Sequence, residues 1–148
     1  MKSLLFPAGF VAGMPAVGLL FLRLICGIGL AFHGWPKIQN PTSWMGPDVP
    51  AFMQLFAAAA EFLGGIAIAV GFLTPLACLA AISTMFVAVW VHLTNEATPT
   101  YFVKFDQRGP GDSYELALIY FVMSLAILLA GPGKLAIDAL WADRKRGN

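Results

Sequence analysis

The chain has 148 residues, of which 59% are hydrophobic and only 11% are charged. A soluble domain usually carries about 25% charged residues, so this composition indicates a membrane protein. The formal net charge of +1 excludes the strong basic field of a nucleic-acid-binding protein. We therefore expect one compact integral domain over residues 1–148, with the lipid bilayer as a partner and no nucleic acid.

The first eighteen residues resemble a weak signal peptide. Pro7, Gly9, Gly13 and Pro15 interrupt the apolar stretch, and no clear cleavage site precedes a polar start. We therefore expect this segment to be retained as a short lead-in along the membrane surface.

Four apolar segments approach or reach the roughly 20 residues that are needed to cross about 30 Å of hydrocarbon. We place these spans at residues 16–35, 51–72, 75–94 and 114–131. Only the short link 72–75 separates the second span from the third, so these two form an antiparallel hairpin. The longer connections 36–50 and 95–113 then lie together on the opposite side. The predicted fold is all-α, an antiparallel four-transmembrane-helix bundle with a short amphipathic C-terminal tail.

The distribution of basic residues predicts the orientation of this bundle. Five lie on the side of the termini and three on the side of the longer loops: Lys2, Lys134, Arg144, Lys145 and Arg146 against Lys37, Lys104 and Arg108. Because cytoplasmic loops carry an excess of Lys and Arg, we expect cytoplasmic termini. The expected location is the bacterial cytoplasmic (inner) membrane.

Glu61 lies at the midpoint of the second span. A charge at that depth costs roughly 2.5 to 3.5 kcal/mol on insertion scales, so it usually faces a partner or a wet cavity. Counted from the expected helix ends, Arg23 of the first span lies at almost the same height. We predict an Arg23–Glu61 contact in the bundle core, direct or through water. The alternative is that this pair only fixes the register of the two helices.

Further polar residues converge on the outward half of the predicted bundle. Proton handling is one use for them, since imidazole titrates near neutral pH and burial can raise the pKa of a carboxyl group toward it. The candidate catalytic residues form a path from the membrane interior outward: Glu61, Arg23, His33, His92 and Glu115. The candidate cofactor-binding residues are Gln54, Lys37 and Tyr114.

The sequence contains no recognisable motif for a resident cofactor. Neither HxxxH nor ExxH spacing places two metal ligands on one helix face, so no metal site is predicted. There is also no GxGxxG fingerprint, cysteine cluster or defensible pair of haem ligands. Cys26 and Cys78 lie in apolar segments without CxxC spacing, and we expect buried structural thiols. The four tryptophans, Trp44 among them, fall at or near predicted interfaces, where indole commonly serves as an anchor.

The chain contains several short motifs whose order and spacing resemble those of the DoxX family of small four-helix membrane proteins. They are Arg23, Phe32-His33-Gly34 with Lys37, Glu61-Phe62-Leu63-Gly64-Gly65, Gly71-Phe72-Leu73-Thr74-Pro75, His92, Tyr114-Glu115, and the segment from Gly131 to Asp138. The resemblance implies a link to redox systems, since the name-giving relatives are a subunit of a thiosulfate:quinone oxidoreductase. Other relatives partner with soluble detoxifying enzymes and thiol-related proteins. The implied substrates are small sulfur compounds or thiols, with quinone as the electron acceptor.

Three functions are therefore compatible with the sequence. The first is a membrane component of a redox system, such as a subunit of a quinone-linked oxidoreductase, that binds a quinone or a small sulfur or thiol compound in an outward-facing polar cavity. The second is a non-catalytic membrane anchor or scaffold for a partner enzyme. The third is permeation of a small molecule, which is less favoured because transporters commonly show internal repeats. A homo-oligomer would supply that missing symmetry.

Overall fold

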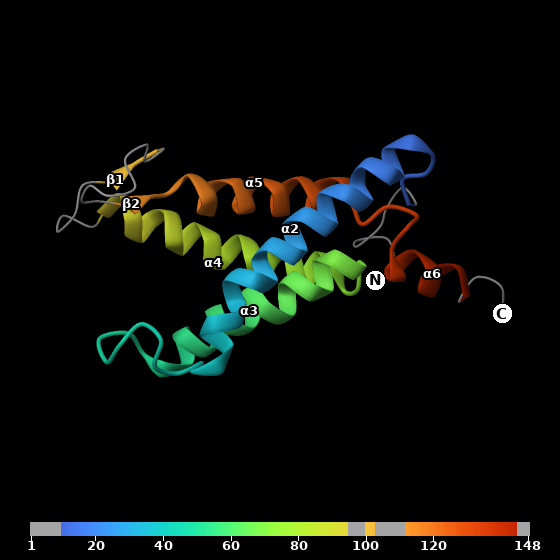
Figure 1. Ribbon diagram of the computed structural model, residues 1–148. Coiled ribbons are helices and arrows are strands. Elements are labelled where there is room, and N and C mark those ends of the chain that lie inside the picture. The colour runs from blue at the N-terminus through green and yellow to red at the C-terminus, as the bar shows by residue number, and fades with distance from the viewer. Residues whose placement is uncertain (1–9, 95–99, 103–111, 145–148) are drawn as a thin grey trace.

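The computed structural model describes residues 10–94, 100–102 and 112–144. These residues are mostly helical, with one pair of two-residue strands (Figure 1). The helices are α2 (Met14–Gln39), α3 (Ala51–Val70), α4 (Thr74–Thr94), α5 (Glu115–Ala130) and α6 (Ile137–Arg144). Strands β1 (Thr100–Tyr101) and β2 (Asp112–Ser113) pair in parallel. The strand pair was not predicted, whereas the all-α class is otherwise confirmed for these residues.

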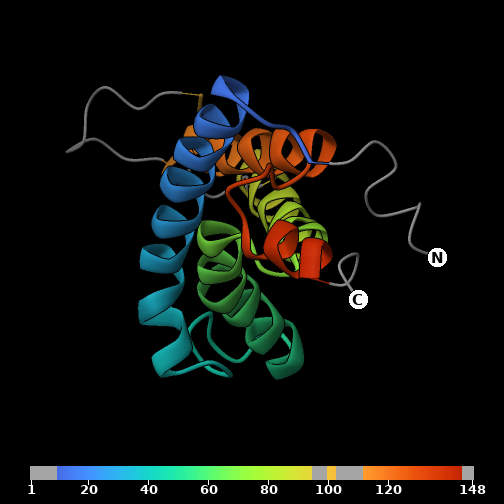
Figure 2. The same ribbon diagram turned by 90° about the vertical axis from the view of Figure 1, so that its right-hand side faces the viewer.

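Helices α2 to α5 pack as a closed bundle. Each helix contacts the next along the chain, and α5 returns to contact α2, as the view along the bundle shows (Figure 2). The bundle therefore has two distinct ends. We call the end with residues 40–50 and the two strands the loop end, and the end with the α3–α4 turn and α6 the terminal end (Figure 1).

Three of the predicted spans are confirmed as helices long and apolar enough to cross a membrane, namely α2, α3 and α4. The fourth segment forms α5, an apolar helix of 16 residues. At 1.5 Å per residue it is roughly 24 Å long, which is less than the hydrocarbon thickness of about 30 Å. That α5 completes a fourth crossing therefore stays a prediction.

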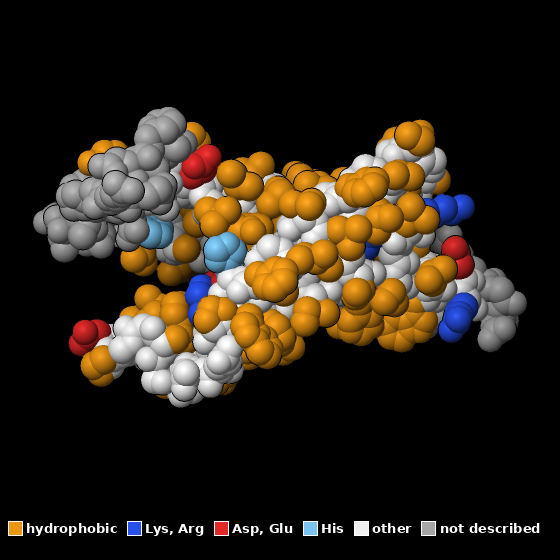
Figure 3. All heavy atoms as spheres, in the orientation of Figure 1, with side chains coloured by type: hydrophobic (Ala, Val, Ile, Leu, Met, Phe, Trp, Pro, Cys, Tyr) orange, Lys and Arg blue, Asp and Glu red, His pale blue; other side chains and the backbone are white. Residues whose placement is uncertain are grey.

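Large apolar side chains cover the outside of the bundle, as the orange surface in Figure 3 shows. Phe32, Leu76 and Leu129 are 75%, 64% and 79% exposed. An apolar surface this continuous is unfavourable in water and suits contact with lipid tails. Together with the three long apolar helices, it identifies the chain as a membrane protein.

The α3–α4 hairpin is confirmed, and its turn has a clear backbone cause. Gly71 takes the left-handed conformation, with φ of 72°. The N–H of Phe72 donates to the carbonyl of Ala67 at 2.9 Å, and that of Gly71 to Ile68 at 3.2 Å. These two bonds satisfy the last carbonyls of the helix and end it, so α3 stops at Val70 rather than at residue 72.

Helix α2 extends beyond its predicted end at residue 35. Residue 36 is a proline, and proline disfavours the helical conformation in the residue before it. The helix nevertheless continues through Pro36 to Gln39. This additional turn places Lys37 on the helix, seven residues after Leu30 and four after His33, and therefore on the same face.

Candidate functional site

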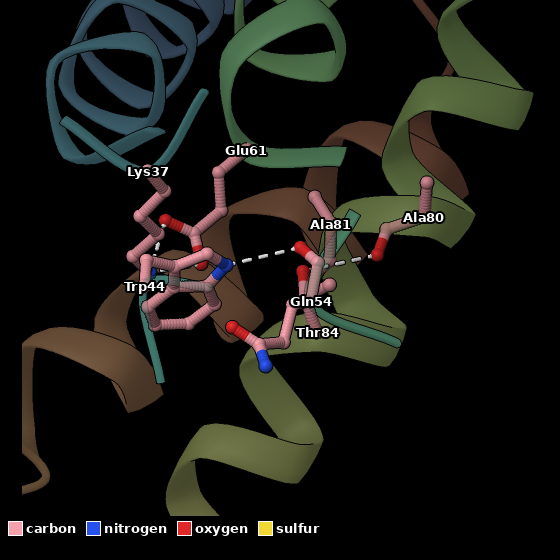
Figure 4. Close-up of polar contacts among 7 residues, drawn as sticks. All are labelled: Lys37, Trp44, Gln54, Glu61, Ala80, Ala81 and Thr84. Carbon is pink, nitrogen blue, oxygen red and sulfur yellow. Dashed lines mark hydrogen bonds and ion pairs between the residues drawn. The ribbon is translucent and has the colours of Figure 1, made fainter. Parts of the chain in front are cut away.

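Glu61 is paired with Lys37 near the loop end of the bundle. The Lys37 Nζ donates to both carboxylate oxygens, at 2.5 Å and 2.6 Å (Figure 4). The Glu61 side chain is only 4% exposed, whereas that of Lys37 is 26% exposed. Lys37 also lies 4.5 Å from the centroid of the Trp44 ring. The carboxylate thus has the partner that its depth requires.

The predicted contact between Arg23 and Glu61 is wrong. Arg23 lies at the terminal end, where its Nη2 donates to the carbonyl of Leu135 at 2.7 Å. Its guanidinium packs directly against Gly71, where a Cβ atom would overlap Nη1. Arg23 therefore does not lie beside Glu61, as the predicted proton path assumed.

The packing of α2 against α3 explains this error. A side chain on Gly34 would overlap the backbone of Phe62, and one on Gly27 would overlap Gly65, so the two helices touch through backbone at these levels. Glu61 thus lies level with Gly34. Arg23 lies eleven residues before Gly34, roughly 16 Å away along the helix. The predicted heights of Arg23 and Glu61 were counted from the predicted helix ends, and that count did not show this distance between them.

A cavity of about 210 Å³ opens beside the Lys37–Glu61 pair and is bordered by all four bundle helices. Its polar lining comes from His33, Lys37, Glu61, His92, Ser113 and Tyr120. Its apolar lining comes from Leu30, Met85, Ala88, Leu116 and Ala117. In Figure 3 the pale-blue histidine side chains lie next to a hollow at the loop end. The cavity therefore combines an apolar wall with a few converging polar groups, which is typical of small-molecule sites.

Of the eight residues singled out from the sequence, four line this cavity together: His33, Lys37, Glu61 and His92. They come from α2, α3 and α4, so only the folded bundle brings them together. The other four lie elsewhere.

Gln54 is one of these four, and it fastens the connection between α2 and α3. Its Oε1 accepts from the N–H of Met45 at 2.8 Å, and its Nε2 donates to the carbonyls of Gly46 and Val49 at 2.9 Å and 2.8 Å. The Nε1 of Trp44 donates to the Gln54 carbonyl at 3.1 Å (Figure 4). These bonds use the amide group and hold Trp44 beside Lys37, so Gln54 positions the loop rather than facing a ligand.

Tyr114 and Glu115 lie at the start of α5, next to the cavity but outside its lining. The N–H of Tyr114 donates to the carbonyl of Tyr101 at 3.3 Å, and its ring lies edge-on to that of Phe102 with centroids 5.6 Å apart. The N–H of Glu115 donates to the Ser113 hydroxyl at 3.2 Å. These contacts attach the start of α5 to the strand pair.

Tyr120 is a cavity residue that the sequence interpretation missed. Its ring lies edge-on to that of His33, with centroids 5.6 Å apart and an interplanar angle of 73°. Its hydroxyl packs against Gly29, where a side chain would overlap it. The available signal was spacing, because Tyr120 and Ser124 lie one helical turn apart in an otherwise apolar part of the segment.

Deeper in the bundle, Cys26 and Cys78 are fully buried free thiols, and their predicted burial is confirmed. The Cys26 Sγ lies 3.6 Å from the Ser124 Oγ. This contact ties α2 to α5 below the cavity. Among the described residues, no cluster of three His, Cys, Asp or Glu side chains could hold a metal ion.

Comparison with protein families gives one match, to the family described as DoxX, over residues 18–93. The match covers just over half of the chain, from α2 to the end of α4. It therefore includes His33, Lys37, Glu61 and His92. Comparisons with curated proteins and with solved structures give no match.

Proposed function

The chain belongs to the DoxX family, and from this premise we propose that it is a membrane component of a redox system that binds a quinone head group in the loop-end cavity. The observation that carries the proposal is the neutral polar lining beside an apolar wall. Lys37 and Glu61 neutralise each other, so the pair offers no net charge to an anion. An uncharged ring with hydrogen-bond acceptors suits this lining better than a charged sulfur oxyanion.

The size and the donor groups of the cavity support the same ligand. A volume of about 210 Å³ is below the 300–1,000 Å³ of most ligand pockets, so it suits a single ring rather than a whole lipid-like molecule. His33 and Tyr120 stand on α2 and α5, and His92 stands on α4. A quinone carries two carbonyl oxygens on opposite sides of its ring, and these groups would donate to them.

The same residues would handle protons. Reduction of a quinone to a quinol takes up two electrons and two protons. Histidine is the commonest general acid and base in proteins, and His33 and His92 would pass protons to the two carbonyl oxygens. The electrons would come from a partner protein that oxidises a thiol or another small sulfur compound.

The proposed setting is the bacterial cytoplasmic membrane, with both termini in the cytoplasm and the loop end outward. In this arrangement α5 completes a fourth crossing, and the protein partner or a second copy of the chain meets the bundle from the membrane or from its outer face. A role only as an anchor for a partner enzyme would need none of the cavity side chains.

Binding of a short-chain quinone to the purified protein in lipid nanodiscs tests the proposal. Quenching of Trp44, which lies beside Lys37, would report binding. We expect His33→Phe to weaken binding by about fivefold, since it keeps the aromatic contact with Tyr120 but removes one hydrogen bond worth about 1 kcal/mol. His92→Phe should act similarly.

The control is Asp143→Asn on α6, which removes an exposed charge at the other end of the bundle. It should bind quinone as the original protein does. Equal affinity in all these variants, or no quinone binding at all, would favour the anchor over the quinone site. Binding of a small thiol but not of quinone would assign the cavity to the sulfur substrate.

A further inference from the structure

Three buried side-chain polar atoms in the described part of the chain lack a hydrogen-bond partner, and they belong to only two residues. They are Nε and Nη1 of Arg23 and Oγ1 of Thr74. Arg23 is 0% exposed and Thr74 is 1% exposed. Leaving a buried donor unpaired costs about 1–3 kcal/mol, and more for a charged group. Buried polar groups in native folds almost always have a partner, so each of these atoms requires an explanation, of which a bound water or ion is one.

Both residues lie where two segments meet at the terminal end, the turn 71–74, which includes Thr74, and the segment 135–138. Arg23 donates to Leu135 and touches Gly71. Thr74 donates its backbone N–H to the Oδ2 of Asp138 at 2.9 Å, and the N–H of Asp138 donates to the carbonyl of Gly71 at 2.9 Å. Arg23 and Thr74 thus belong to one cluster through these shared contacts, distant from the loop-end cavity.

The charges of this cluster balance. Asp138 is the acidic group that interacts electrostatically with Arg23. Its Oδ1 accepts from the N–H of Leu73 at 2.9 Å, so both of its oxygens are used at the start of α4. There Asp138 acts as a helix cap supplied by a distant part of the chain. What the cluster still requires is acceptors for the guanidinium and a partner for the hydroxyl, without additional charge.

We propose that this cluster is a binding site for water, distinct from the quinone site. Buried water molecules accept hydrogen bonds from Arg23 Nε and Nη1 and bond to Thr74 Oγ1. Water meets both needs because it accepts and donates, carries no charge, and commonly bridges buried polar groups that have no protein partner. The bound water joins α2, the start of α4 and the segment 135–138, and so helps to attach the C-terminal segment to the bundle.

An electron-density map of the full chain at a resolution that reveals ordered water tests the site directly. We expect density within hydrogen-bond distance of Arg23 Nε or Nη1 and of Thr74 Oγ1. A map in which protein atoms satisfy these groups, with no such density, would overturn the proposal. Crystals soaked in bromide distinguish an anion, since an anomalous peak beside Arg23 would reassign the site from water to a halide.

A matched pair of variants gives an independent test by thermal unfolding. Thr84 is also buried, but its hydroxyl already donates to the carbonyls of Ala80 and Ala81 within its own helix, at 3.1 Å and 3.0 Å (Figure 4). Thr84→Val therefore measures the general cost of replacing a buried helical threonine by its isostere.

With bound water, we expect Thr74→Val to lower the Tm by several degrees more than Thr84→Val does. Without it, removal of an unpaired buried hydroxyl should leave the Tm unchanged or raise it. That second result would refute the part of the proposal that concerns Thr74. If Thr74→Val does not fold, the map of the original chain still decides.

Discussion

Glu61 has a partner, as the cost of a charge inside an apolar helix requires, and that partner is Lys37. The need for a partner could be predicted from one residue and its depth. The identity of the partner could not, because it depends on how α2 and α3 align and on whether α2 continues through Pro36. Both are outcomes of packing between segments rather than properties of either segment alone.

The ion pair should contribute strongly to stability. Breaking a buried pair by removing one partner typically costs 3–5 kcal/mol. The Lys37 side chain is 26% exposed, so water can partly solvate its ammonium when the partner is lost. We therefore expect Glu61→Gln to lower the free energy of unfolding by about 3 kcal/mol, at the lower end of that range. Denaturant titration of the protein in detergent micelles would measure this.

Combining Lys37→Met with Glu61→Gln isolates the pair. Glu61→Gln alone leaves the Lys37 ammonium without its partner, and Lys37→Met removes that ammonium. The double variant should therefore be more stable than Glu61→Gln alone. The single variant Lys37→Met completes the comparison. If the double variant loses as much free energy of unfolding as the two single variants do in sum, the Lys37–Glu61 interaction is not the source of the effect.

At the level of elements, the short link predicted the α3–α4 hairpin correctly, whereas the relative heights of α2 and α3 were predicted wrongly. The alignment is set by small residues such as Gly27, Gly34 and Gly65, where the backbones meet. Small residues occur throughout these helices, so the sequence alone does not say which of them form contacts. The end of α2 was missed for a related reason, since packing overrode the local effect of Pro36.

Gly34 and Gly18 provide a matched test of this alignment. A Cβ at Gly34 would overlap the backbone of Phe62, while a Cβ at Gly18 meets nothing within 4 Å. We expect Gly34→Ala to lower the free energy of unfolding by about 1–3 kcal/mol, the usual cost of overpacking. Gly18→Ala should be neutral or stabilising by up to about 1 kcal/mol. Equal effects in unfolding experiments would argue against close backbone contact at Gly34.

For the whole molecule, composition was sufficient to identify a membrane protein, and the alternation of spans and loops placed both longer connections at one end. The cavity could be predicted only in part. His33, Glu61 and His92 were chosen as polar residues in apolar segments and Lys37 as a charge just beyond one, and the bundle brings them together. Tyr120 was missed because an aromatic residue in an apolar helix resembles any lipid-facing one.

The topology can be tested with Asn40→Cys and Asp143→Cys, at exposed positions on either side of α3, α4 and α5. The native thiols are fully buried and should not react. In intact cells stripped of their outer membrane, an impermeant maleimide should label the Asn40→Cys variant directly and the Asp143→Cys variant only after permeabilisation. Labelling of both from the same side would show that α5 does not cross, and the reverse pattern would place the termini outside.

The most direct test of the quinone site is photochemical labelling of the protein in nanodiscs with an azido-quinone, followed by mass mapping of the adducts. We expect adducts on cavity segments, around His33 and His92 and between Ser113 and Tyr120, and we expect excess unlabelled quinone to abolish them. Adducts spread over the lipid-facing surface and insensitive to competition, or no adducts at all, would contradict the quinone site.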